Sequence, residues 1–296
     1  MVAPLRRVIV KQPEAAFRSQ EQIERQWEAL NYLAPPDYGA ALAEHARLIE
    51  MLEEAGAEVM CLPPDERTGL DSIYVHDPVL ATDRGVLLLQ MGKPARRGEP
   101  PAMRDALTAW GLPIAGALSG EATAEGGDLV WLDPHTLLAG RSYRTNDAGI
   151  AQLRAMLGPD GVTVLDFPLP HWDGRASVLH LMSVLSMLDD DLAVVYPRLM
   201  PVTLVELLER RGIEMVEAPD AEYDSLGCNV LALAPRRALI KHGNPETVRR
   251  MRAAGCEVWE FDGEEIGYKG SGGPTCLTRP IDRGPRAEAS NTPPAA

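Results

Sequence analysis

The sequence predicts an α/β protein built from repeated units, and three features of the 296-residue chain indicate this fold class. Helical patterns with one apolar face recur, each ends at a glycine, and a strand-like run follows each glycine. The glycines are spaced 55, 50, 51 and 43 residues apart, at Gly56, Gly111, Gly161, Gly212 and Gly255. A period of about 50 residues favours a solenoid or a radial array. Five units that each mix strands with one helix favour closure into a ring, and an open doubly wound α/β sheet is the alternative.

The first unit shows how each join is made. A helix is predicted over 38–55 because Leu42, Leu48 and Leu52 fall on one face. Gly56 can adopt the left-handed conformation that ends a helix without a Cβ penalty. The apolar run 58–62 then predicts a strand.

The later units repeat this order along the chain. Their helices are predicted at 103–110, 150–157, 204–211 and 248–254, and the strands that follow at 112–115, 162–165, 213–216 and 256–259. Further strands are predicted at 8–11, 86–91, 129–138, 178–188, 192–196 and 229–239. Residues 1–282 are predicted to form a single domain. Residues 283–296 have no apolar periodicity and are predicted to be a disordered tail.

Composition excludes several classes of partner. Lys and Arg number 29 and Asp and Glu 43, which gives a net charge of −14. An acidic chain repels phosphate backbones and anionic lipid surfaces, so neither nucleic acid nor a membrane is an expected partner. The longest apolar stretch, 178–188, is too short to span a bilayer, and residues 1–12 lack the apolar core of a signal peptide. A homodimer is compatible with the sequence.

The cysteines predict a reducing compartment. Cys61, Cys228, Cys256 and Cys276 form no CxxC pair, and four in a chain of this length do not make a disulfide scaffold. The His and Cys positions lack the spacing of a zinc site, so no metal and no cofactor is expected. The predicted location is the cytoplasm.

Four polar stretches are candidates for chemistry. In 71–77, a strand would place Asp71 and Asp77 on one face and His76 on the other. In 125–128, Glu125 and Asp128 flank two glycines, which indicates either a hairpin turn or a close approach to a ligand. The stretch 141–147 follows it, and Thr145, Asn146 or Asp147 is predicted to cap the next helix.

The other two stretches supply a base and a thiol. His180 lies in an apolar strand pattern, where a histidine is either a hydrogen-bonded core residue or a base. Cys276 follows a glycine-rich loop that can bring backbone and sulfur close to a substrate. A cysteine nucleophile needs a base or a positive field, and His180 is the candidate partner.

Together these segments resemble the guanidine-modifying enzymes of the pentein superfamily, most of all the dimethylarginine dimethylaminohydrolases. The resemblance covers 8–281 and rests on motifs in the family's order: DSIYVHD, KPARRGE, EGGD, RTN, HLMS and GGPTCLTRP. It implies a single-domain, five-bladed, pseudo-symmetric α/β propeller with the site on the central axis. The implied activity is hydrolysis of a C–N bond in a methylated arginine or related guanidino compound, without a cofactor.

The resemblance also implies a role for each matching residue. Cys276 matches the nucleophile, His180 the general acid and base, and Glu125 the carboxylate that pairs with both histidine and substrate. Asp77 matches the carboxylate that grips the guanidinium, and Asp71 a position that contacts the α-amino end. The remaining positions are Arg96 and Arg144, which match arginines for the substrate carboxylate, and Asp128, which braces the site.

Two departures bear on the substrate. His76 stands where the dimethylarginine hydrolases carry an acid, so it is a candidate specificity residue. Met182 stands where arginine deiminases carry a second guanidinium-binding aspartate. An arginine deiminase or dihydrolase, or an amidinotransferase on another guanidino substrate, is the alternative. A non-catalytic pentein binding protein is the remote one, because such proteins lack the Cys–His–Glu set.

Overall fold

The secondary structure forms five sheets of three strands each in a computed structural model that describes residues 1–175 and 177–285. In every sheet an antiparallel pair is extended by a third strand, parallel to the middle one. The sheets are β15-β1-β2 (Arg279–Arg283, Leu5–Val10, Glu58–Cys61), β3-β4-β5 (Val79–Thr82, Gly85–Leu88, Ile114–Ala117), β6-β7-β8 (Leu129–Asp133, Thr136–Arg141, Thr163–Pro168), β9-β10-β11 (Leu185–Asp189, Leu192–Val195, Glu214–Glu217) and β12-β13-β14 (Leu231–Ala234, Arg237–Lys241, Glu257–Phe261).

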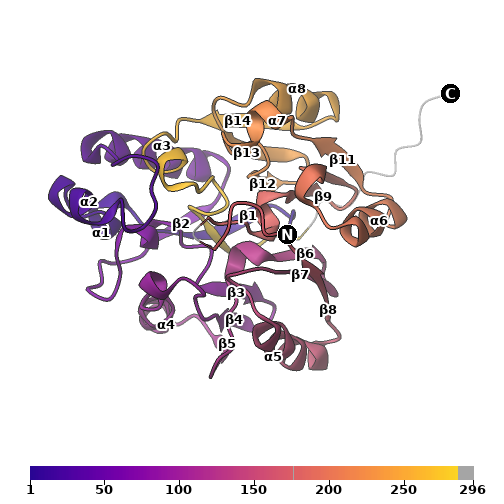
Figure 1. The fold of residues 1–296 in the computed structure, drawn as a ribbon, viewed down its shortest axis with the longest axis horizontal. Coiled ribbons are helices and arrows are strands. Elements are labelled where there is room, and N and C mark those ends of the chain that lie inside the picture. The colour runs from indigo at the N-terminus through magenta and orange to yellow at the C-terminus, as the bar shows by residue number, and fades with distance from the viewer. Residues whose placement is uncertain (176, 286–296) are drawn as a thin grey trace.

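One long helix joins the middle and outer strands of each sheet, as a parallel connection requires. Figure 1 shows these five helices around the outside of the molecule and the strands toward its centre. The helices are α3 (Tyr38–Glu54), α4 (Glu99–Ala109), α5 (Asp147–Leu157), α6 (Val202–Arg210) and α8 (Pro245–Ala253). The short helices α1 (Pro13–Ala16), α2 (Gln20–Gln26) and α7 (Asp220–Tyr223) complete the set among the described residues.

The predicted glycine joins are confirmed. Every one of the five repeat glycines has a positive φ, between 67° and 95°. Each glycine lies between the long helix of its unit and the third strand of the sheet. The left-handed conformation therefore reverses the chain at the same point in each unit.

The chain closes into a ring, which decides between the ring and the open doubly wound sheet. Strand β15, from the C-terminal end of the described chain, pairs antiparallel with β1, with Val8 opposite Pro280 and Ile9 opposite Arg279. The two ends of the fold therefore share one sheet. Neighbouring sheets contact each other through strands nearest the centre, such as β9 with β12 and β3 with β15 (Figure 1).

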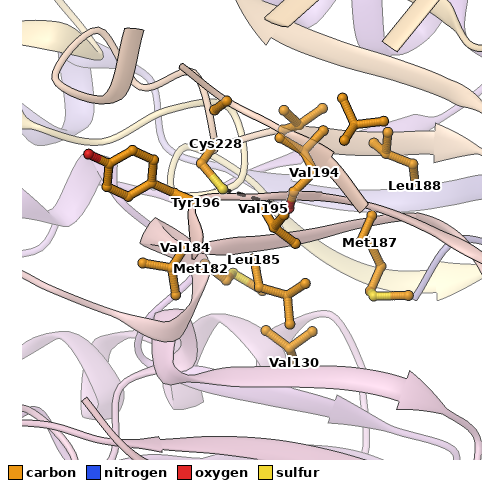
Figure 2. Close-up of a cluster of buried hydrophobic side chains, with 14 of the residues drawn as sticks. Val130, Met182, Val184, Leu185, Met187, Leu188, Val194, Val195, Tyr196 and Cys228 are labelled. Atoms are coloured by element: carbon orange, nitrogen blue, oxygen red, sulfur yellow. Dashed lines mark hydrogen bonds between the residues drawn. The ribbon is translucent and has the colours of Figure 1, made fainter. Parts of the chain in front are cut away.

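Apolar side chains fill the space between adjacent sheets. Figure 2 shows one such cluster, which combines Leu185 of β9 and Val194 of β10 with Val130 of β6 in the adjacent sheet. Cys228 is buried in this cluster and its thiol lies 3.6 Å from the Val194 carbonyl oxygen. Burial raises the pKa of the Cys228 thiol far above its usual range, so this cysteine packs as a small apolar residue.

Several predicted elements differ from the structure. The strands predicted over 129–138 and 229–239 are each an antiparallel hairpin, formed by β6 with β7 and by β12 with β13. The predicted strand over 71–77 is a 3₁₀ turn, Leu70–Ile73, followed by irregular chain, because Ser72 bonds back to the Gly69 carbonyl and competes with extension. In 178–188 only β9 is a strand, since Ser183 Oγ accepts from the His180 N–H and folds 181–183 into another 3₁₀ turn. The two 3₁₀ turns matter for function, because turns aim Asp77 and His180 where strands would not.

The predicted tail also begins too early. Strand β15 runs to Arg283, whose guanidinium donates to the carbonyls of Ala3 and Ala232, and Gly284 N–H bonds to the Pro4 carbonyl. The remainder of the predicted tail, 286–296, lies outside the described residues. Among the residues that are described, none of the helices is both long enough and apolar enough to cross a bilayer.

Candidate active site

The candidate site is built from five loops that reach the same end of the ring. Each loop leads into the first strand of a sheet, namely β3, β6, β9, β12 or β15. Each also places one polar side chain within five residues of that strand: Asp77, Glu125, His180, Asn229 and Cys276. The pseudo-symmetry of the fold therefore brings together residues that lie far apart in the chain.

Three of these side chains form a buried cluster. His180 Nε2 lies 2.9 Å from Glu125 Oε2, and His180 Nδ1 lies 3.9 Å from Asp77 Oδ1. Burial alone would lower the pKa of His180. The charges of Asp128 and Asp77 and the bond to Glu125 outweigh burial and raise that pKa to about 9. The imidazole is therefore a cation at neutral pH, which suits a general acid.

Glu125 is fully buried and stays ionised. Its Oε1 accepts from the Lys93 backbone N–H at 3.0 Å, and Arg144 Nη1 lies 3.4 Å from both of its oxygens. Burial would raise the pKa of Glu125, but the bond to His180 and the charges of His180 and Arg144 hold it below its usual value. The predicted site residues Glu125, His180 and Arg144 are thus in contact.

Asp77 is also an anion, and its partner within the protein is Arg96. Arg96 Nη1 donates to Asp77 Oδ2 at 2.5 Å, and the Gly127 N–H donates to Asp77 Oδ1 at 2.9 Å. Although burial opposes ionisation, the Arg96 and His180 charges hold the pKa of Asp77 far below its usual value.

Most N–H groups of the Arg96 guanidinium already donate hydrogen bonds inside the protein. Its Nε and Nη2 donate to Glu99 at 2.9 and 2.8 Å, and Nη2 also donates to the Tyr74 carbonyl. With the bond to Asp77, four of the five guanidinium N–H groups are used. Within the protein Arg96 therefore holds Asp77, and its contact with a substrate carboxylate stays a prediction.

The thiol of Cys276 has a partner that the sequence analysis missed. Asn229 Nδ2 lies 3.2 Å from Cys276 Sγ, and Asn229 Oδ1 accepts from the Thr275 backbone N–H at 3.1 Å. Burial and the Asp77 charge raise the pKa of Cys276 to about 11, and the Asn229 donor opposes this rise. The repeat could have indicated Asn229, because this residue precedes β12 in the same way as Cys276 precedes β15.

Close backbone packing keeps the loops together. A Cβ on Gly127 would lie 2.2 Å from His180 Nδ1, and one on Gly126 would lie 2.2 Å from the His76 carbonyl oxygen. The two glycines form a 3₁₀ turn, Gly126–Asp128, rather than the hairpin turn considered from sequence. Their lack of side chains makes room for the imidazole.

Asp128 ties the His180 loop to the third sheet. Its Oδ1 accepts from the Leu181 N–H at 3.1 Å and its Oδ2 from Ser142 Oγ at 2.6 Å. Burial raises the pKa of Asp128 to about 6. Asn146 caps helix α5 by accepting from the Gly149 N–H, which confirms one of the three predicted caps and fixes the segment that carries Arg144.

His76 contacts the segment that follows Cys276. Its Nδ1 lies 2.9 Å from the Thr278 carbonyl oxygen, while its buried Nε2 has no hydrogen-bond partner in the described structure. Burial and the Arg279 charge lower the pKa of His76 to about 3, so the ring is neutral. It lines a cavity of about 1300 Å³ that extends to the hairpin turns at 83–84 and 133–135.

Asp71 forms an ion pair with Lys93. Lys93 Nζ lies 2.7 Å from Asp71 Oδ2 and donates to the Leu30 carbonyl oxygen at 2.7 Å. Both side chains are largely buried. Neither Lys93 nor this pairing was predicted from the sequence.

The donor set favours an organic cation over a metal. Ligand atoms of Asp77, Glu125 and His180 lie within 4.8 Å of one another, which is close enough to surround an ion. However, Arg96, Arg144 and the imidazolium already bring positive charge to the two carboxylates. A planar cation with N–H donors can share these carboxylates, and a thiol lies in a neighbouring loop.

Comparison with known proteins extends over most of the chain. A sequence model of the family "N,N dimethylarginine dimethylhydrolase, eukaryotic" matches residues 16–283. The chain is 29% identical over 248 residues to an N(G),N(G)-dimethylarginine dimethylaminohydrolase of Pseudomonas aeruginosa, covering 84% of this chain and 91% of that protein. It is 32% identical over 194 residues to an arginine deiminase of Mycobacterium avium, covering only 55% and 47%.

Solved structures show the same fold. The structure of a dimethylarginine dimethylaminohydrolase of Pseudomonas aeruginosa, a cysteine-to-serine mutant complexed with citrulline, matches with a TM-score of 0.75 and 26% identity over 93% of this chain and 98% of that one. The N-terminal domain of a cyanobacterial arginine dihydrolase matches with a TM-score of 0.78 and 18% identity over 94% and 97% of the two chains. The predicted propeller is thereby confirmed.

Proposed function

The chain belongs to the N,N-dimethylarginine dimethylhydrolase family, and from this we propose that it hydrolyses the terminal C–N bond of an N-methylated arginine to give citrulline and a methylamine. The observation that carries the proposal is the buried contact of Glu125 with His180 beside the Asp77 carboxylate, whose charge also acts on the Cys276 thiol. One loop from each of four sheets supplies these groups.

Substrate binding follows from charge. A guanidinium is a planar cation with a fork of N–H donors that carboxylates grip in pairs. Asp77 and Glu125 are both ionised, and each keeps part of its oxygen lone-pair capacity beside the Arg96 and Arg144 contacts. In this proposal they hold the guanidinium carbon against Cys276 Sγ.

The first half of the reaction forms a covalent intermediate. The Cys276 thiolate attacks the guanidinium carbon, and the C=N electron pair moves onto nitrogen in a tetrahedral adduct. The C–N bond to the methylated nitrogen then breaks as the His180 imidazolium gives that nitrogen its proton. A methylamine leaves, and a thiouronium remains on the sulfur.

The second half returns the enzyme to its starting state. Neutral His180 takes a proton from water, the hydroxide adds to the thiouronium carbon, and the C–S bond breaks to restore the thiolate. The added hydroxyl loses its proton to solvent, where the released amine takes it up. The product carries a urea group in place of the guanidine. Positioning contributes about 7–11 kcal/mol to such a reaction and acid–base catalysis about 3–5 kcal/mol.

Met182 supports a methylated substrate over arginine. Its side chain is buried in the apolar cluster around β9 and offers no charge to an unmethylated guanidinium nitrogen. The nucleophile also requires a reduced thiol, and all four cysteines are free. We therefore place the protein in a reducing compartment, the cytoplasm, and retain a homodimer as a prediction that the molecular mass in solution tests.

A product screen tests the proposal. Purified protein is given dimethylarginine, monomethylarginine, arginine and agmatine, with Cys276→Ser as the control, and products are read by mass spectrometry. We expect citrulline and dimethylamine from dimethylarginine with the wild type and none with Cys276→Ser. Citrulline and ammonia from arginine alone would replace the proposal with a deiminase. Turnover that needs an added amine would replace it with an amidinotransferase.

A further inference from the structure

Lys93 places an ammonium group where the substrate's own ammonium is expected. The family resemblance assigns Asp71 to the α-amino end of the substrate. In this structure Lys93 Nζ lies 2.7 Å from Asp71 Oδ2 and 2.7 Å from the Leu30 carbonyl oxygen. The side chains of Lys93 and Asp71 are only 16% and 8% exposed, so this is a buried ion pair rather than a surface contact.

The position of Lys93 is fixed from both sides. Its backbone N–H donates to Glu125 Oε1 at 3.0 Å, which ties it to the acid–base pair. Pro94 begins the 3₁₀ turn Pro94–Arg96 directly after it, and that turn ends at the arginine that holds Asp77. The ammonium is therefore held within the site by the same segment that organises the two carboxylates.

The pairing of Lys93 with Asp71 changes which substrates the site can distinguish. A site that reads a substrate's ammonium with a buried carboxylate rejects an analogue that lacks it, because the carboxylate is left unpaired. Such rejection reaches about 10⁴–10⁵-fold in sites built around a hydrogen-bonded group. Here Lys93 already neutralises Asp71, so a substrate without an α-ammonium leaves no buried charge unpaired. A substrate with one has to displace Lys93.

We propose that this site also hydrolyses N-methylated ω-guanidino carboxylic acids that have no α-amino group, and that Lys93 determines this breadth. The inference rests on the proposed function, since the same C–N bond is cleaved through Cys276. Water enters as before, and the products are an ω-ureido carboxylic acid and a methylamine. Arg144 remains the cation assigned to the substrate carboxylate.

A matched pair of substrates tests the inference. Dimethylarginine and 5-(N,N-dimethylguanidino)pentanoic acid differ only in the α-amino group, and kcat/KM is measured for both. We expect the wild type to use the second compound at least as well as the first. A preference of about 1000-fold or more for dimethylarginine would overturn the inference and leave the proposed function standing. Hydrolysis of neither compound would overturn both.

Two variants distinguish the effect of Lys93 on substrate preference from the effect of removing any positive charge. Lys93→Met keeps most of the side-chain volume and leaves Asp71 free to read an α-ammonium. We expect it to lower kcat/KM for the pentanoic acid relative to dimethylarginine by at least 100-fold. Arg97→Ala, which removes an exposed cation four residues further on, should leave the ratio unchanged. An equal ratio in Lys93→Met and the wild type would overturn the role of Lys93, and the wild-type ratio decides the inference if that variant does not fold.

Discussion

At the scale of single residues, the surroundings of the site raise the pKa values of both His180 and Cys276. His180 is held as an imidazolium by the anions around it, while Cys276 is held as a thiol by burial and by Asp77. The free enzyme therefore contains mostly the wrong protonation state for sulfur attack at neutral pH. A bound guanidinium adds positive charge near the sulfur and favours the thiolate.

This arrangement predicts an alkaline optimum for kcat/KM. The active form pairs a thiolate with an imidazolium, so the profile rises until the first pKa of about 9 and falls above the second of about 11. Below pH 9, kcat/KM should fall about tenfold per pH unit, because the pair then carries one proton too many. Initial rates from pH 6 to 11.5 measure this, and a flat profile from pH 6 to 10 would contradict the Cys–His pair.

The sequence identified most residues of the site but not their partners. Cys276, His180, Glu125 and Asp77 were all named, and the structure places each at the same end of the ring. Asn229 and Lys93 were missed because an Asn before a strand and a Lys before a proline have many ordinary uses. The contacts of Arg96 with Asp77 and of the His76 ring with the Thr278 carbonyl were not predicted either, since they depend on tertiary packing.

At the scale of elements, the loops before β3, β6, β9, β12 and β15 carry the candidate site residues, and the strands position these loops. Two of these loops were predicted as strands, and both contain side chains that bond to nearby backbone, Ser72 and Ser183. Such local bonds compete with extension and cannot be separated from strand patterns by hydrophobic alternation. By contrast, the helix-ending glycines depend on local conformation alone, and all five were predicted correctly.

The turn Gly126–Asp128 gives a test at this scale. Gly127→Ala places a methyl group 2.2 Å from His180 Nδ1 and must displace the imidazole. We expect kcat/KM to fall at least 100-fold, the order of loss that a misplacement of about 1 Å causes. Gly158→Ala is the matched control, because its Cβ meets nothing within 4 Å and its φ of −54° suits alanine. Wild-type kcat/KM in Gly127→Ala would contradict the proposed place of His180.

At the scale of the whole molecule, the ring closes on itself through β1 and β15. The closure is what sets the Cys276 loop beside the loops of the other sheets, because β15 begins at Arg279. Sequence periodicity predicted the repeat and favoured a ring, but closure depends on pairing between residues about 270 positions apart, which no local pattern encodes.

Shortened chains test the closure. A chain that ends at Pro285 keeps β15 and should melt at the same temperature and with the same activity as the full chain. A chain that ends at Thr278 keeps Cys276 but loses β15, so β1 has an unpaired edge and Arg283 no longer bonds to Ala3 and Ala232. We expect this chain to lose its cooperative thermal transition. Wild-type melting of the chain ending at Thr278 would show that closure is dispensable.

Trapping the covalent intermediate tests whether Cys276 is the nucleophile. Wild-type protein turning over dimethylarginine is quenched in acid within milliseconds, and the tryptic peptide 270–283, which contains Cys276, is weighed by mass spectrometry. We predict that this peptide gains the mass of the substrate less dimethylamine, that the gain lies on Cys276, and that it is absent from Cys276→Ser. Continued formation of citrulline with no adduct on Cys276, or turnover by Cys276→Ser, would contradict the account.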